Sequence, residues 1–262
     1  MTTIISVQSF DTRRNSLWRL RRAFISVVVV ASLHASQGWA AKSANAPSNT
    51  APAVASKPAS VAAAKFAHFG KETPSLDARH IADWVADSRD NARVEFFIVD
   101  KKAARIYVFD ADAQLKGSSA VLLGFAIGDD SAPGIGLKPL KAVKPEEKTT
   151  PAGRFAAERG RNTSGEDVIW IDYDAAVSMH RVRASNAKER RLERLASPTV
   201  DDNRISFGCI NVPAVFYNTY VRPVFAKRRA IVYVLPETRT AQQVFKSYDV
   251  AVKHGLPTRS PM

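Results

Sequence analysis

The chain is organised around one stretch, Arg204-Ile205-Ser206-Phe207-Gly208-Cys209-Ile210-Asn211-Val212-Pro213, which holds its only cysteine. A single thiol cannot form a disulfide within the chain, so Cys209 is a reactive group, an intermolecular linker or an inert buried residue. Ser206 and Gly208 favour a tight turn in which backbone N–H groups converge and a substrate carbonyl can approach. The stretch therefore favours a cysteine nucleophile, and Pro213 predicts a helix start directly after it.

Two other motifs precede this stretch. They are Thr150-Pro151-Ala152-Gly153-Arg154-Phe155 and Ser178-Met179-His180. In this order the three motifs resemble the signature of the L,D-transpeptidase (YkuD-type) catalytic domain, which carries Thr-Pro-x-Gly-x-Phe, then a His, then Ser/Thr-His-Gly-Cys-Ile/Val-Asn/Arg. The resemblance runs from about Val94 to Pro236, and three ordered motifs are far more specific than any one of them.

Two positions depart from the family pattern. Phe207 stands where most members have a second His. The gap between His180 and Cys209 is also longer than usual in the family, which predicts an insertion beside the site. The first departure concerns oxyanion stabilisation or local hydrogen bonding rather than the Cys–His pair itself.

The resemblance implies a fold, a site and a substrate. The fold would be a mainly β, β-sandwich-like catalytic domain with a few short helices. Cys209 would attack a peptidoglycan stem peptide and form a thioester, with His180 as the base and a backbone carbonyl around Arg181 as its orienting partner. The thioester would pass to an amine of another stem, to a wall-attached protein or to water. No metal or organic cofactor is implied.

The residues support a β fold independently of that resemblance. Short β-branched and aromatic runs separated by turn residues are typical of strands, and few long helical patterns interrupt them. Backbone N–H groups of Gly208 and Cys209 are the candidates for holding an oxyanion. We expect Ser206 and Asn211 to brace the turn by hydrogen bonds. The predicted strand regions are 94–99, 105–109, 114–127, 155–159, 168–173 and 230–235.

Composition predicts how the N-terminal part is processed. Residues 1–40 have a basic start, an apolar run from Phe24 to Leu33 and small residues before Ala40, which indicates a secretory signal peptide cleaved near Ala40. Cleavage would place the protein in the periplasm or cell wall, whereas an uncleaved segment would anchor it to the membrane. Residues 41–72 are rich in Ala, Pro, Ser and Lys and predict a flexible linker.

The remaining chain divides into three further segments. Residues 73–93 predict a helical lead-in that begins with Thr73 as its cap. Residues 94–236 form the catalytic domain in this interpretation. Residues 237–262 predict a C-terminal helix, over 240–252, followed by a tail.

The predicted insertion carries a run of arginines. Residues 186–195 predict a short helix capped by Asn186. We expect its arginines to attract carboxylates of an acidic peptide substrate, with a solvated charged helix as the alternative. The three candidate substrate-binding residues are Arg190, Arg191 and Arg194.

Charge and motif content narrow the function classes. The formal net charge of +13 suits a polyanionic partner. Nucleic acid is disfavoured because no base-reading motif appears and export would separate the two. No cluster with metal-ligand spacing appears, so no metal is expected. Transpeptidation is the first interpretation. The alternatives are an L,D-carboxypeptidase or endopeptidase that hydrolyses the same thioester, and a non-catalytic wall-binding module in which Cys209 is a buried small residue.

Overall fold

The computed structural model describes residues 63–257 of the chain. The predicted signal peptide and residues 41–62 of the predicted linker lie outside the described residues, as do residues 258–262 of the tail. Among the residues that are described, no helix has the length and apolar character needed to cross a membrane.

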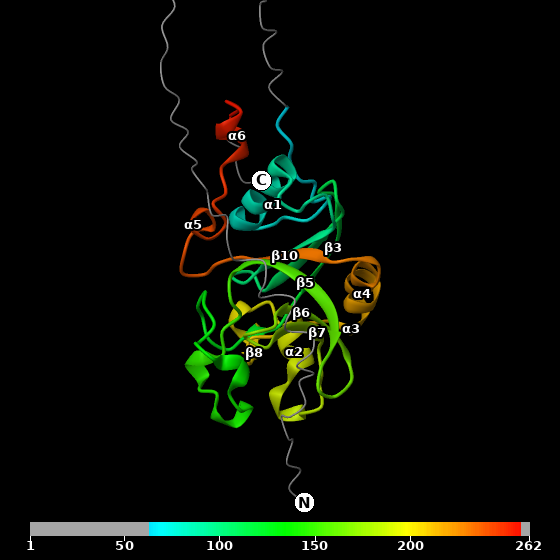
Figure 1. The fold of residues 1–262 in the computed structure, drawn as a ribbon, viewed down its shortest axis with the longest axis vertical. Coiled ribbons are helices and arrows are strands. Elements are labelled where there is room, and N and C mark those ends of the chain that lie inside the picture. Colours follow the sequence, from blue (N-terminus) through cyan, green and yellow to red (C-terminus); the bar gives the residue numbers. More distant parts are fainter. Residues whose placement is uncertain (1–62, 258–262) are drawn as a thin grey trace, which may run out of the picture. The chain divides into compact units, whose positions relative to one another are not determined.

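One large mixed sheet dominates the described part of the chain (Figure 1). The pairs β1–β10 and β7–β9 are parallel, and the other neighbouring pairs of this sheet are antiparallel. The prediction of a mainly β fold is therefore confirmed. In spatial order the eight strands are β3 Leu115–Ala120, β2 Arg105–Phe109, β1 Phe96–Asp100, β10 Ala230–Val234, β5 Gly153–Arg161, β6 Asp167–Asp172, β7 Val177–Arg181 and β9 Ile210–Val212.

A second, two-stranded sheet supports the start of the motif that contains the cysteine. It pairs β4, Leu123–Gly124, with β8, Arg204–Ser206, in parallel. Backbone hydrogen bonds in both directions between Leu122 and Asn211 connect the approach to β4 with β9. The predicted strand region 114–127 contains two strands, β3 and β4, which belong to different sheets.

The helices are short. Pro213 precedes α3, as predicted, and a π-helical turn joins α3 to α4. The α-helices are α1 Leu76–Ser88, α2 Arg191–Ala196, α3 Ala214–Phe216, α4 Arg222–Lys227, α5 Ala241–Phe245 and α6 Val250–Lys253, and the π turn is Tyr217–Val221. The 3-10 turns are Ile135–Leu137, Leu140–Ala142, Pro145–Glu147, Ala187–Glu189 and Val200–Asn203.

The central strands are buried on both faces of the sheet, which explains their continuous apolar sequence. In β1, Phe97 and Val99 belong to one core cluster, while Phe96 and Ile98 belong to another. Successive side chains of a strand point to opposite faces, so the two clusters lie on the two sides of β1. The first continues into α3 and α4, and the second continues into α1. In Figure 1, β10 runs between α1 and α4.

Three helix predictions differ from the structure in their ends. The lead-in helix begins at Leu76 and is capped by the Ser75 hydroxyl, which accepts the Ala78 N–H at 3.1 Å, rather than by Thr73. The terminal helix predicted over 240–252 is two helices, because Lys246 takes a left-handed conformation between them (φ 56°). The insertion helix is likewise broken by left-handed Arg190 (φ 50°). Isolated left-handed residues end a helix, and periodicity alone does not reveal them.

The predicted linker extended too far at its C-terminal end. Phe69 is only 4% exposed and packs edge-on against Tyr107 and Phe109, with ring centroids 5.5 and 5.1 Å apart. The His68 N–H donates to the Ala113 carbonyl at 2.9 Å, and the His68 carbonyl accepts from the Leu115 N–H at 2.8 Å. Ala67 and Phe69 are both 4% exposed, so this part of the predicted linker packs against the domain.

Candidate active site

Parallel pairing of β7 with β9 brings the predicted nucleophile and base together. In this register His180 lies opposite Asn211. Directly paired residues share a face of a sheet, and residues two apart on a strand share it as well. Cys209 lies two residues before Asn211, so it projects to the face that carries His180. The two side chains are hydrogen-bonded to each other, and Cys209 stays half-buried rather than sealed in the core.

The turn before Cys209 has a conformation that favours glycine. Gly208 has φ 127°, and a Cβ at this position would come within 2.7 Å of the Thr149 carbonyl oxygen. The Ser206 hydroxyl donates to the Cys209 carbonyl at 2.6 Å and accepts the Gly208 N–H at 3.1 Å. Because that bond engages the Gly208 N–H within the turn, the Cys209 N–H is the remaining candidate oxyanion donor of the two.

Thr150 connects the upstream motif to this turn. Its hydroxyl donates to the Gly208 carbonyl at 2.8 Å and accepts the Gly124 N–H at 2.9 Å. The Thr150 carbonyl in turn accepts from the ammonium of Lys101, which is fully buried and also pairs with Asp129 at 3.1 Å. The first residue of the Thr-Pro-x-Gly-x-Phe motif therefore fixes the cysteine turn through one hydroxyl.

Hydrogen-bond chemistry determines the tautomer of His180. Its Nδ1 lies 2.8 Å from the Arg181 carbonyl oxygen. A carbonyl can only accept, so Nδ1 carries the proton in the neutral ring and Nε2 presents a lone pair. The carbonyl of Arg181 thus has the position that the motif resemblance implied for the orienting group. Its bond leaves Nε2 available to receive the proton of the Cys209 thiol.

The electrostatics of the pair are mutual. Burial by itself would raise the pKa of the Cys209 thiol, but the hydrogen bond and charge of His180 and the Ser178 N–H, 3.5 Å from the sulfur, lower it below its ordinary value. Burial would lower the pKa of His180, but the hydrogen bond and charge of Cys209 raise it overall, against an opposing contribution from Arg191. Each group therefore favours the charged form of the other.

Asn211 lies beside both members of the pair. Its Nδ2 is 3.3 Å from Nε2 of His180 and 3.3 Å from the Cys209 carbonyl oxygen. Its Oδ1 accepts from Nη1 of Arg191. Sequence reasoning expected Asn211 to brace the turn, and the bond to the Cys209 carbonyl does so; its contacts with His180 and Arg191 were not foreseen.

The three arginines of the insertion have different surroundings. Arg191 reaches Asn211 and Glu189, and its side chain is 14% exposed. Arg194 donates to the carbonyl oxygens of Glu189 and Asp202, so it holds the insertion together. Arg190 pairs with Glu193, and its side chain is 69% exposed. Only Arg191 contacts the site residues, a distinction that the charged pattern of the helix did not contain.

An apolar rim with one cation borders the cysteine turn. Phe207 is 41% exposed, and the Lys148 ammonium lies 4.1 Å from the centre of its ring. Phe125, 53% exposed, is held beside this turn by its N–H, which donates to the Ser206 carbonyl at 2.9 Å. Sequence reasoning missed Lys148 and Phe125, because loop residues carry no periodic signal for the surface they will face.

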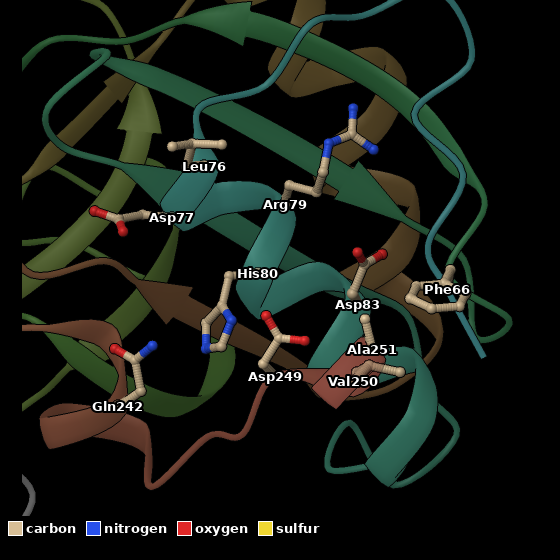
Figure 2. A pocket seen from close by; sticks show the side chains of 10 residues that line it. All are labelled: Phe66, Leu76, Asp77, Arg79, His80, Asp83, Gln242, Asp249, Val250 and Ala251. Atoms are coloured by element: carbon tan, nitrogen blue, oxygen red, sulfur yellow. The ribbon is translucent and has the colours of Figure 1, made fainter. Parts of the chain in front are cut away.

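A separate hollow lies between α1 and the C-terminal segment (Figure 2). Its volume is about 250 Å³, and His80, Asp77 and Asp249 are among its lining residues. The imidazole of His80 is hydrogen-bonded to the Ser247 hydroxyl at 2.9 Å. Neither this hollow nor any other part of residues 63–257 contains a group of His, Cys, Asp and Glu side chains arranged to hold a metal ion.

No protein-family model and no curated protein matches the sequence. Solved structures that match include the helical cell shape determining protein Pgp2 from Campylobacter jejuni, at 13% identity and a TM-score of 0.37, over 60% of this chain and 55% of that one. They also include the catalytic domain of an Enterococcus faecium L,D-transpeptidase, at 18% identity and a TM-score of 0.28, over 55% of this chain and 98% of that one.

A longer structure of an Enterococcus faecium L,D-transpeptidase matches at 17% identity and a TM-score of 0.29, over 54% of this chain and 50% of that one. The chain thus spans about half the length of the Campylobacter protein and of this longer structure. The similar structures include members of the family whose motifs the sequence resembles.

Proposed function

We propose that this chain is an L,D-transpeptidase: a cysteine-dependent acyltransferase that acts on peptidoglycan stem peptides through a thioester on Cys209. The observation that carries the proposal is the oriented pair of His180 and Cys209. The Nδ1–H of the ring donates to the Arg181 carbonyl, and the ring is also hydrogen-bonded to a half-buried thiol. A nucleophile, a base and an orienting group in this order are what acyl transfer through a cysteine requires.

The first half of the reaction forms the thioester. The Cys209 thiol gives its proton to Nε2 of His180, and the sulfur forms a bond to a peptide carbonyl carbon. The C–N bond to the following D-Ala then breaks. The imidazolium returns the proton to the departing amine, so the products are a thioester and free D-Ala.

The second half releases the acyl group. An amine of another stem attacks the thioester carbon and passes a proton to Nε2, and the C–S bond breaks to restore the Cys209 thiol. A wall-attached protein is an alternative acyl acceptor. The Cys209 N–H is our candidate for holding the oxyanion in both halves, and a donor of this kind is worth about 3 kcal/mol where it has been measured in other enzymes.

The substrate class comes from the three motifs and from the charge of the chain. The Thr-Pro-x-Gly-x-Phe, His and Ser-x-Gly-Cys-Ile-Asn segments resemble those of enzymes that act after the third stem residue, usually diaminopimelate. The net charge of +13 includes five arginines and one aspartate of residues 1–40, so the chain stays basic after cleavage near Ala40. A basic protein with the Lys148 ammonium at the rim of its site suits an acidic peptide in an anionic wall. Export directed by residues 1–40 would place the protein in the periplasm or cell wall, where this substrate lies.

Product analysis on defined stem peptides tests the proposal. Purified protein is incubated with a tetrapeptide stem, and the products are weighed by mass spectrometry. We expect a covalent adduct on Cys209 with loss of D-Ala and a cross-linked dimer. A free tripeptide in place of the dimer would make the protein the hydrolase of the alternative interpretation. No adduct and no product, from protein whose thiol reacts rapidly with iodoacetamide, would overturn the proposal.

A further inference from the structure

The amide of Asn211 has one orientation that satisfies all its neighbours. The Arg191 guanidinium can only donate, so the amide atom that faces it is the oxygen Oδ1. The Cys209 carbonyl can only accept, so the atom that faces it is the nitrogen Nδ2. Both contacts demand the same orientation. The second hydrogen of Nδ2 is then directed at Nε2 of His180, 3.3 Å away.

This orientation matters for the proton that His180 must receive. With an N–H directed at it, Nε2 is favoured as a lone-pair acceptor, which is the form needed to take the thiol proton. If the amide rotated by half a turn, Oδ1 would face Nε2 and would instead stabilise a proton there. The orientation of Asn211 therefore biases the resting ring toward the neutral base.

Arg191 is held in place by contacts that do not involve the catalytic pair. Its Nε donates to the Glu189 carboxylate, and its side chain is 14% exposed. Arg194 ties the two ends of the insertion together through the Glu189 and Asp202 carbonyls. The Asn203 side chain then anchors the end of the insertion in the core by donating to the Val121 carbonyl at 2.9 Å. Arg191 thus reaches Asn211 from a braced support.

We propose that Arg191 is a positioning residue that fixes the amide of Asn211 with its N–H toward Nε2 of His180, so that the insertion between β7 and β9 is part of the catalytic apparatus. The catalytic importance of this role rests on the proposed function. The positioning itself is inferred from the contacts among residues 180, 191, 209 and 211. It assigns Arg191 a role that its neighbours Arg190 and Arg194 do not share.

Removing Arg191 should raise the pKa of His180 through two separate effects. The groups whose charge acts on the ring are Cys209, in its thiolate form, and the Arg191 guanidinium, which opposes protonation of the ring. Without the guanidinium, only the Cys209 carbonyl still holds the Asn211 amide in this orientation, so the amide rotates more readily and can accept from Nε2–H. Both changes favour the imidazolium, so the pKa of His180 rises. Glu189 partly neutralises Arg191, so the charge effect alone is small.

The test measures the pKa of His180 in the full chain, by recording NMR spectra of its ring protons as the pH is changed. The Cys209→Ala background is used because a coupled thiol would otherwise share the titration, and His180→Gln identifies the resonance. We expect Arg191→Met to raise the pKa of His180 by about one unit, and Arg191→Lys, which keeps a charged donor, by less than half of that. The matched control is Arg190→Gln, which should leave the titration unchanged.

A double-variant cycle separates positioning from charge. Asn211→Ala alone should raise the pKa of His180, because it removes the N–H that opposes protonation. Arg191→Met in the Asn211→Ala background should then add only a small part of its shift in the wild-type background, since no amide remains to rotate and only the charge effect is left. Full additivity of the two shifts, or no shift in Arg191→Met, would overturn the inference. The titration needs no substrate, so it decides this question even if stem peptides prove not to be turned over.

Discussion

Within residues 63–257, two histidines, His180 and His80, are hydrogen-bonded to a thiol or hydroxyl side chain, and the rest of their surroundings differs. His180 bonds to Cys209 and has its other nitrogen on the Arg181 carbonyl. His80 bonds to Ser247 in the hollow of Figure 2. Asp249, which could have oriented that ring, accepts the Val252 N–H at 3.0 Å and so caps α6.

The pKa directions of the two rings express the same contrast. For His80, burial is the largest influence and lowers its pKa, against weaker attraction from Asp249 and Asp77. For His180, burial is also the largest single influence, yet the Cys209 hydrogen bond and charge together with the Arg181 carbonyl outweigh it and raise the pKa. A His beside a hydroxyl or thiol is therefore not a catalytic pair until a third group orients it and the partner can hold the opposite charge.

The largest expected effect comes from replacing the side chain that each histidine contacts. Replacing Cys209 with Ala should abolish the thioester adduct and lower turnover of a stem tetrapeptide by about 10⁴-fold or more. Replacing Ser247 with Ala should leave turnover unchanged. Product mass spectrometry measures both, with thermal unfolding as the check on folding. Turnover retained in Cys209→Ala, or lost in Ser247→Ala, would reverse the comparison.

The two histidines give the next effect. His180→Gln should lower turnover by about 10²- to 10⁴-fold, the range for general acid–base groups. It should also move the pH profile of Cys209 alkylation to higher pH, because the thiol loses the hydrogen bond and charge that lower its pKa. His80→Gln is the matched control and should change neither. An unshifted alkylation profile in His180→Gln would contradict the mutual electrostatics of the pair.

A buried lysine supports the cysteine turn and has no counterpart beside His80 among its described contacts. Lys101 is fully buried against Asp129 and the Thr150 carbonyl, and burial lowers its pKa to about 8 against the opposing effect of Asp129. Lys101→Met should lower the free energy of unfolding by about 3 to 5 kcal/mol, because it removes the buried ammonium that neutralises Asp129. Asp129 then keeps only its contacts with residues 237–239. Urea denaturation measures this loss.

The same variant should affect the two histidine sites unequally. Lys101 donates to the Thr150 carbonyl, and the Thr150 hydroxyl holds the Gly208 carbonyl. The rate of Cys209 alkylation should therefore change in Lys101→Met at temperatures where this variant remains folded. The titration of His80 should stay as it is in the unchanged chain. Equal disturbance of both sites would mean that Lys101 supports the whole domain rather than the cysteine turn.

The smallest effect is the dependence of stability on pH, which has opposite signs at the two rings. The pKa of His80 is lowered in the folded state, so its contribution is present above the unfolded pKa near 6.5 and is lost as the pH falls through that region. The pKa of His180 is raised, so its contribution is present below 6.5 and is lost as the pH rises through the folded pKa. The free energy of unfolding, measured by urea denaturation between pH 5 and 8, should depend less on pH in both variants. His80→Gln should reduce the dependence on the acid side of this range, and His180→Gln on the neutral side.

Local sequence was sufficient for the turn and for the positions of most strands along the chain, but not for β7, β8 and β9 or for the spatial order of the strands. Gly208 and Pro213 act on the backbone of their immediate neighbours, and alternating or continuous apolar runs report strand burial, so the turn, the helix start and most strands could be predicted. The ends of the helices could not, because Arg190 and Lys246 take left-handed conformations that neither residue type favours. The same holds for the burial of Phe69, whose partners Tyr107 and Phe109 are distant in the chain.

By itself, the sequence determined which residues could perform chemistry: one thiol, one motif histidine and a glycine turn directly before the thiol. Only the tertiary structure decided that β7 and β9 pair in parallel with His180 opposite Asn211, and that Arg191 alone of three arginines reaches that pair. The physical reason is range. Backbone preferences and side-chain periodicity act over a few residues, whereas strand register and a guanidinium contact depend on how segments some twenty to thirty residues apart pack against one another.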